Sequence, residues 1–137
     1  MKTKTIVSIV LRLIAAFIML QTLYFKFTAQ PESVYIFSTI GIEPWGRIGT
    51  GVAELIASIL LLIPATIAIG ALMAVGIMLG AIVTHVAILG IEVPGDGGQL
   101  DGGQLFMYAL VVFVASAILV IMYRQQLLDL KNRLIKA

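Results

Sequence analysis

The sequence predicts an all-α membrane protein, a polytopic bundle of four transmembrane helices, and three observations lead to that prediction. Apolar residues make up 61% of the 137 residues and charged residues only 12%, whereas soluble domains have about 45–50% and about 25%. Four apolar runs approach the roughly 20 residues that a spanning helix needs. Polar or proline-containing connections separate these runs. We therefore expect one four-helix transmembrane domain over residues 1–137.

The first predicted span is residues 5–25, interrupted by Arg12 and Gln21. Two lysines precede it, as in a secretory signal, but Arg12 interrupts the apolar run and Lys26 stands beside the one small-residue stretch that could be cleaved. We expect this helix to be retained.

The connection over residues 26–47 contains a predicted short helix. Pro31 and Glu32 open it, Val34 and Phe37 recur at helical spacing, and Gly41 follows its end. Proline and an acid in the first turn and glycine after the last turn are helix boundary signals. We expect this helix to lie on the outer membrane surface.

The second and third spans, residues 48–63 and 65–90, are separated by Pro64, whose ring clashes with the preceding turn. A glycine-rich acidic loop over 91–103 leads to the fourth span, residues 104–123, and a polar tail over 124–137. The pentapeptide DGGQL occurs twice in tandem, at 96–100 and 101–105. This duplication leaves the register of the fourth helix open by up to five residues.

The distribution of basic residues predicts the orientation of the chain. With four spans, the side that holds both termini carries six lysines and arginines, and the other side carries only Lys26 and Arg47. Cytoplasmic segments are enriched in Lys and Arg. We expect a multi-pass protein of the plasma membrane with both termini in the cytoplasm. The basic residues do not form a nucleic-acid footprint.

A few polar side chains lie inside the predicted spans, and they are the candidate site residues. A charge in mid-bilayer costs about 2.5–3.5 kcal/mol on the insertion scale and usually faces the bundle interior. At about 100° per residue each predicted helix has one polar or small stripe, and at about 1.5 Å per residue most of these side chains lie roughly 7–10 Å below the outer surface. The predicted pocket residues are Lys26, Glu54, His85, Gln104 and Tyr108, with Arg12 deeper as the floor.

Small residues that share these stripes predict close helix packing. Gly51 and Ser58 lie on the face of Glu54, and Gly76, Gly80 and Thr84 form a stripe beside His85.

Each candidate also has an ordinary interpretation. Arg12 can snorkel to the inner headgroups, Lys26 can anchor the helix end at the interface, and Glu54 can form a purely structural ion pair with either of them. His85 can simply hydrogen-bond across helices, and Gln104 and Tyr108 can serve in packing or the aromatic belt. We expect no metal site, because His85 is the only histidine and the chain has no cysteine.

The pattern resembles the DoxX family of four-helix membrane proteins. The resemblance rests on RLIAAF at 12–17 with Lys26 fourteen positions after Arg12, GVAE at 51–54 followed by LLL at 60–62, the short segment 34–42, and the late His85. It implies a four-helix bundle. The family is named for a subunit of a thiosulfate:quinone oxidoreductase, so the resemblance implies a redox role only by analogy.

Three hypotheses for the function follow. The first is a non-catalytic or accessory membrane subunit, assembled with oxidoreductase subunits, whose pocket binds a small amphipathic molecule such as a quinone, with Glu54 and His85 exchanging protons. The second is an oligomeric proton-coupled transporter or channel that uses Glu54. The third is a structural scaffold in which the polar residues only lock the bundle. In any of these roles we expect a homo-oligomer in the lipid bilayer.

Overall fold

The computed structural model describes residues 2–137, apart from the side chain of Asp96, and the described chain is helical without strands. Four helical segments are long and apolar enough to cross a membrane: α1 (Thr3–Phe27), α3 (Trp45–Leu62), the segment Pro64–Leu89 and α5 (Gln104–Met122). The third segment consists of a 3-10 turn (Pro64–Thr66), α4 (Ile67–Thr84) and a π-helical turn (His85–Leu89). The structure thus confirms the predicted all-α class and the four apolar helices.

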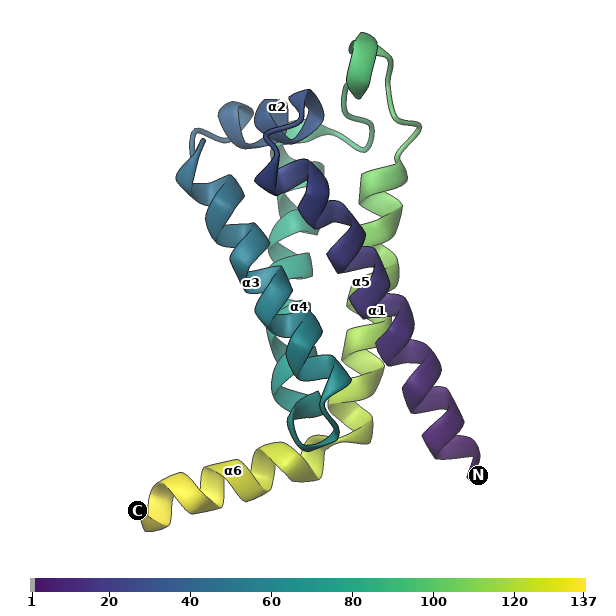
Figure 1. Cartoon of the computed structure of the whole chain (residues 1–137), viewed down its shortest axis with the longest axis vertical. Coiled ribbons are helices and arrows are strands. Elements are labelled where there is room, and N and C mark those ends of the chain that lie inside the picture. The colour runs from purple at the N-terminus through teal and green to yellow at the C-terminus, as the bar shows by residue number, and fades with distance from the viewer. Residues whose placement is uncertain (1) are drawn as a thin grey trace.

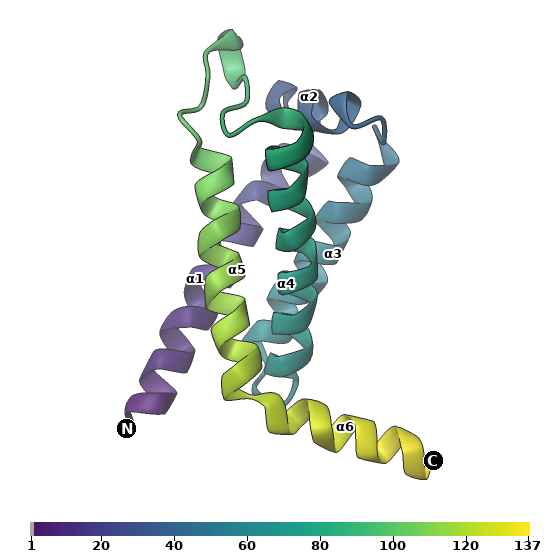
Figure 2. The same cartoon turned by 180° about the vertical axis from the view of Figure 1, so that it is seen from behind.

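The four long helices form a ring in which each packs against two neighbours, in the order α1, α3, α4, α5 (Figures 1 and 2). Neighbours run antiparallel. The short helix α2 (Pro31–Thr39) lies across one end of the bundle, and both termini lie at the other end. The largest fully buried apolar side chains are Met19, Leu61, Ile67, Leu119, Val93 and Val112. Three of these six, Leu61, Ile67 and Leu119, lie near the end of the bundle that holds the termini.

The turn between α3 and α4 is tight because Pro64 ends α3 and Gly70 lets α4 come close to it. A Cβ atom at Gly70 would lie 2.8 Å from the backbone nitrogen of Leu61 and 3.0 Å from the carbonyl oxygen of Ala57. Such distances exclude any larger residue without a backbone shift. Gly70 is thus the close-packing glycine between these two helices.

Two arginines connect α1 and α3 at opposite ends. Arg12 of α1 donates through Nε to Leu61 O at 2.5 Å and through Nη2 to Leu62 O at 2.9 Å. Arg47 of α3 donates to Lys26 O near the end of α1 and pairs with the Glu43 carboxylate at 2.8 Å. The last four carbonyls of a helix have no intrahelical partner, and cations are favourable near them. Each arginine therefore caps the C-terminal end of the other's helix.

The start of α5 is determined by Asp101. Its Oδ1 accepts hydrogen bonds from the backbone N–H groups of Val93 and Gly103, and its Oδ2 accepts one from Leu105. The second copy of the DGGQL repeat thus opens α5, whereas the first forms a 3-10 turn at Asp96–Gly98 in the protruding loop. The duplication left the start of the fourth helix open, and in the structure the helix begins at Gln104.

The C-terminal segment forms a helix, α6 (Arg124–Lys136), although its sequence predicted only a polar tail. Only Tyr123 separates α6 from α5. The Tyr123 hydroxyl donates to Ser8 Oγ of α1 at 2.6 Å. Gln126 then fixes the first turn of α6, because its side chain accepts from Ala68 N and donates to Pro64 O at the α3–α4 turn. The helix leaves the end of the bundle and runs across the direction of the long helices (Figures 1 and 2).

Candidate functional site

A cavity of about 690 Å³ lies between the helices in the half of the bundle that α2 covers. Its volume falls within the roughly 300–1,000 Å³ of small-molecule sites. Every long helix and α2 contribute to it, and its wall is mostly apolar. The polar and charged side chains on the wall are Gln21, Thr22, Lys26, Glu32, Ser33, Thr50, Glu54, Thr84, His85, Gln104 and Tyr108.

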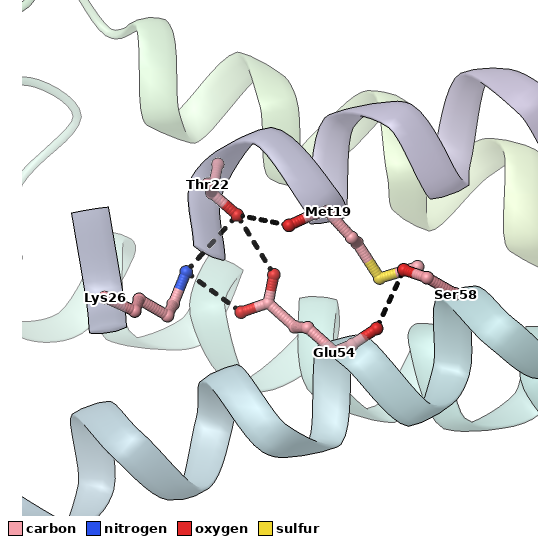
Figure 3. Close-up of polar contacts among 5 residues, drawn as sticks. All are labelled: Met19, Thr22, Lys26, Glu54 and Ser58. Carbon is pink, nitrogen blue, oxygen red and sulfur yellow. Dashed lines mark hydrogen bonds and ion pairs between the residues drawn. The ribbon is translucent and has the colours of Figure 1, made fainter. Parts of the chain in front are cut away.

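Glu54 is the most buried charged residue on this wall, with 3% of its surface exposed. Its Oε1 lies 2.9 Å from Lys26 Nζ, and its Oε2 lies 3.2 Å from Thr22 Oγ1 (Figure 3). Thr22 and Lys26 are four residues apart on α1 and so lie on one helix face. This ion pair joins α1 to α3 at the cavity wall.

The hydroxyl of Thr22 connects the members of this cluster. It lies 2.9 Å from Met19 O, 3.2 Å from the Glu54 carboxylate and 3.4 Å from Lys26 Nζ. A hydroxyl carries a single proton, so Thr22 can donate to Met19 O or to Glu54 but not to both at once. The second oxygen of Glu54 is therefore less firmly held than the first, which faces the lysine.

His85 directly follows α4 and begins the π-helical turn, a feature found frequently at functional sites. It is 5% exposed, its Nδ1 lies 2.9 Å from Gly90 O, and its ring meets that of Phe106 edge to face at 5.6 Å. Because a carbonyl only accepts, Nδ1 carries a proton, and in the neutral ring Nε2 is left as an acceptor. The imidazole is thus fixed in orientation by its backbone contact.

Gln104 and Tyr108 come from the first turns of α5. Gln104 Nε2 donates to the Tyr108 hydroxyl at 3.0 Å, and both side chains line the cavity. Five predicted pocket residues from four helices therefore share one cavity: Lys26, Glu54, His85, Gln104 and Tyr108.

Arg12 does not line this cavity, which differs from the expectation that it forms the floor. Its guanidinium is engaged by the two carbonyls at the end of α3, near the opposite end of the bundle. Neither a side-chain ion pair nor simple snorkelling describes this arrangement. Arg12 connects helices and does not contribute to the cavity wall.

The predicted packing residues have two different surroundings. A Cβ at Gly51 would lie 2.7 Å from the Phe27 ring, so that glycine is at a close contact between α1 and α3, and Ser58 is buried with its hydroxyl on Glu54 O at 2.8 Å. Gly76 and Gly80 instead have no atom within 4 Å of a Cβ position and line the cavity with Thr84. Their small size leaves space in the cavity, where close packing was expected.

Three polar residues that line the cavity, Thr22, Glu32 and Ser33, were not among the residues predicted from the sequence. Thr22 could have been found, because it lies one turn before Lys26 on the same face. Glu32 and Ser33, at the start of α2, also line the cavity, which makes that helix part of the site and not only its cover. Within residues 2–137, with the Asp96 side chain left aside, no cluster of three or more His, Asp or Glu residues could hold a metal ion.

The sequence model of the DoxX-like family matches residues 10–92, more than half of the chain. The matched region includes Arg12, Lys26, Glu54 and His85 and ends before α5, so Gln104, Tyr108 and α6 lie outside it. Comparison with curated proteins and with solved structures gives no match.

Proposed function

Because this chain belongs to the DoxX-like family, and because its four apolar helices make it a multi-pass membrane protein, we propose that it is an accessory membrane subunit that binds a small amphipathic molecule, such as a quinone, in the cavity. One observation carries the proposal. A largely apolar cavity of about 690 Å³ contains a buried Lys26–Glu54 ion pair and an oriented histidine. Apolar walls with a few convergent polar groups are typical of ligand sites.

The polar groups suit the head of a quinone-like ligand. Lys26 Nζ can donate to a ligand carbonyl, and the neutral His85 ring can accept at Nε2 from a ligand hydroxyl. Glu54 and His85 are groups that can give or take a proton when such a ligand changes its redox state. The chain has no cysteine, so in this proposal the electrons come from a partner oxidoreductase subunit, and the chain acts without catalysis of its own.

The test is native mass spectrometry of the protein extracted gently from its own membrane. Wild type is compared with Glu54→Gln, which removes the ion pair, and with Gly76→Leu, which fills the cavity without altering a charge. Asp129→Asn on α6 is the matched control, because it also removes one acidic charge but lies far from the cavity. We expect an amphipathic molecule to co-purify with wild type and Asp129→Asn and to be lost from both cavity variants.

The outcome separates the alternatives. If a phospholipid co-purifies in place of a quinone, the cavity remains a ligand-binding site, but the proposal that its ligand is a quinone is refuted. A ligand-free protein in every sample would refute the binding role, and Gly76→Leu keeps this test meaningful if Glu54→Gln folds poorly.

A structural role is the second candidate, because both carboxylate oxygens of Glu54 have partners within the chain. In that case Glu54→Gln lowers folding yield and removes no ligand. Proton-coupled flux through reconstituted vesicles tests the third possibility, transport.

We also propose that the chain lies in the plasma membrane as a homo-oligomer, with both termini in the cytoplasm and α2 on the outer surface. The charge asymmetry of the termini supports the orientation. Single cysteines introduced at Lys2 and Tyr35 into this cysteine-free chain test it: an impermeant thiol reagent added to intact cells should label only the second.

A further inference from the structure

Helix α6 carries an apolar stripe that the rest of the described chain does not cover. None of its residues is buried, and Leu130 and Leu134 are 37% and 69% exposed. At about 100° per residue, Leu127, Leu130 and Leu134 lie on one face. Leu127, beside the bundle, is half-buried, so the stripe begins at the bundle and continues outward along a free helix.

The position of α6 places this stripe at a membrane boundary. Only Tyr123 separates α6 from the last residue of the spanning helix α5, and Gln126 holds the first turn against the α3–α4 turn. The helix runs across the direction of the spanning helices (Figures 1 and 2). A helix that starts at the end of a span and runs across it stays at the level of the lipid headgroups along its length.

The charges of α6 fit an anionic surface. The helix contains four basic residues and one acidic residue. By the same helical periodicity, Lys131 and Arg133 lie on the two sides of this three-leucine stripe, the exposed Leu128 and Ile135 lie beyond Lys131, and Asp129 lies on the opposite face. An amphipathic helix with leucines on one face and basic residues beside them lies in the membrane interface and is attracted to anionic lipids.

We propose that α6 is an in-plane helix that binds the anionic lipid surface of the leaflet at the terminal end of the bundle, with Leu127, Leu130 and Leu134 among the acyl chains and Lys131 and Arg133 at the phosphates. This proposal is independent of the cavity and its ligand. It gives the protein an anchor that responds to lipid charge.

The experiment uses single cysteines carrying a fluorescent probe in the full chain, because the native chain has no cysteine. Leu134→Cys reports the apolar stripe, and Asn132→Cys reports the opposite face of the same helix. Each labelled protein is reconstituted into vesicles of phosphatidylcholine alone or mixed with phosphatidylglycerol. Quenching by lipid-attached nitroxides measures membrane burial, and quenching by iodide measures exposure to water.

We expect the probe at 134 to be quenched by the nitroxide lipids in the anionic vesicles, and the probe at 132 to be quenched by iodide. A juxtamembrane cation contributes about fivefold to binding of an anionic surface. Lys131→Gln with Arg133→Gln should therefore lower the ratio of embedded to free α6 by roughly 25-fold. Lys2→Gln removes a basic charge at the other terminus of the chain and should leave the ratio unchanged.

Three results would contradict the proposal. Equal iodide quenching at 134 and 132 in anionic vesicles would mean that the stripe stays in water. Protection of 134 from both quenchers, dependent on the protein-to-lipid ratio, would mean that a second copy of the chain covers the stripe. Equal lipid quenching in neutral and anionic vesicles would refute the role of Lys131 and Arg133.

Discussion

Replacement of Lys26 by methionine should strongly destabilise the bundle, because it leaves the buried carboxylate of Glu54 without its cation. The two charged atoms are 2.9 Å apart. At an effective dielectric constant of about 20, their attraction is about 6 kcal/mol before the cost of desolvation is subtracted. The Lys26 and Glu54 side chains are only 16% and 4% exposed, so solvent screens the pair weakly.

The expected loss follows from what remains after the substitution. Removal of one partner of a buried pair typically costs about 3–5 kcal/mol. Thr22 stays as a donor to Glu54, so we expect the lower end, about 3 kcal/mol. Replacing both partners, with Lys26→Met and Glu54→Leu, leaves no buried charge and should return the stability to within about 1 kcal/mol of wild type.

The measurement is reversible unfolding in mixed micelles with increasing sodium dodecyl sulfate, followed by circular dichroism. Asp129→Asn, a surface charge change on α6, is the control and should have little effect. If Lys26→Met alone changes the free energy of unfolding by less than about 0.5 kcal/mol, the pair behaves like an exposed one. If the double variant is as unstable as the single one, the loss does not come from an unpaired charge.

The remaining predictions concern helix contacts and use the same unfolding measurement. Gly70→Ala should lower the free energy of unfolding by about 1–3 kcal/mol, because the new Cβ meets the backbone of α3. Gly76→Ala is the control, and equal losses at both sites would refute the close approach of α4 to α3. Arg12→Met should lower the free energy of unfolding by about 1.5–3 kcal/mol, because two hydrogen bonds to the end of α3 are lost. Arg12→Lys should recover only part of this loss, because an ammonium lacks the separate Nε and Nη2 donors of the guanidinium. Full recovery would mean that the charge alone matters. Asp101→Ala should lower the free energy of unfolding by about 1–3 kcal/mol, because the backbone N–H groups of Val93, Gly103 and Leu105 lose their acceptor. Deletion of residues 96–100 should leave the stability unchanged, because the remaining DGGQL supplies the same cap; a loss as large as that of Asp101→Ala would show that the first copy also contributes.

The helices and the relative placement of most cavity residues could be predicted from the sequence, because a regular helix converts residue number into depth and direction. Glu54 and His85 lie on different helices, yet counting residues from the helix ends puts them at a similar depth, and both line the cavity. The end of α3 at Pro64 follows equally from local chemistry.

The partners of Arg12 could not be predicted in this way. Its hydrogen bonds go to backbone carbonyls at the end of another helix, and every residue has such a carbonyl. The glycines had a related ambiguity, since a stripe of small residues is equally compatible with a close helix contact, as at Gly51, and with an open wall, as at Gly76 and Gly80. Only the position of the facing helix decides between them.

The two arginine caps limit how this bundle can open. A slide of α1 along α3 by a single residue would move the helices by about 1.5 Å, which is enough to pull both guanidinium groups away from their carbonyls at the same time. Because the two helices run antiparallel and are fastened at both ends, a slide in either direction disrupts both caps. Sliding of α1 along α3 is therefore an unfavourable way to open the bundle, and these two helices form the frame against which α2, α4 and α5 pack.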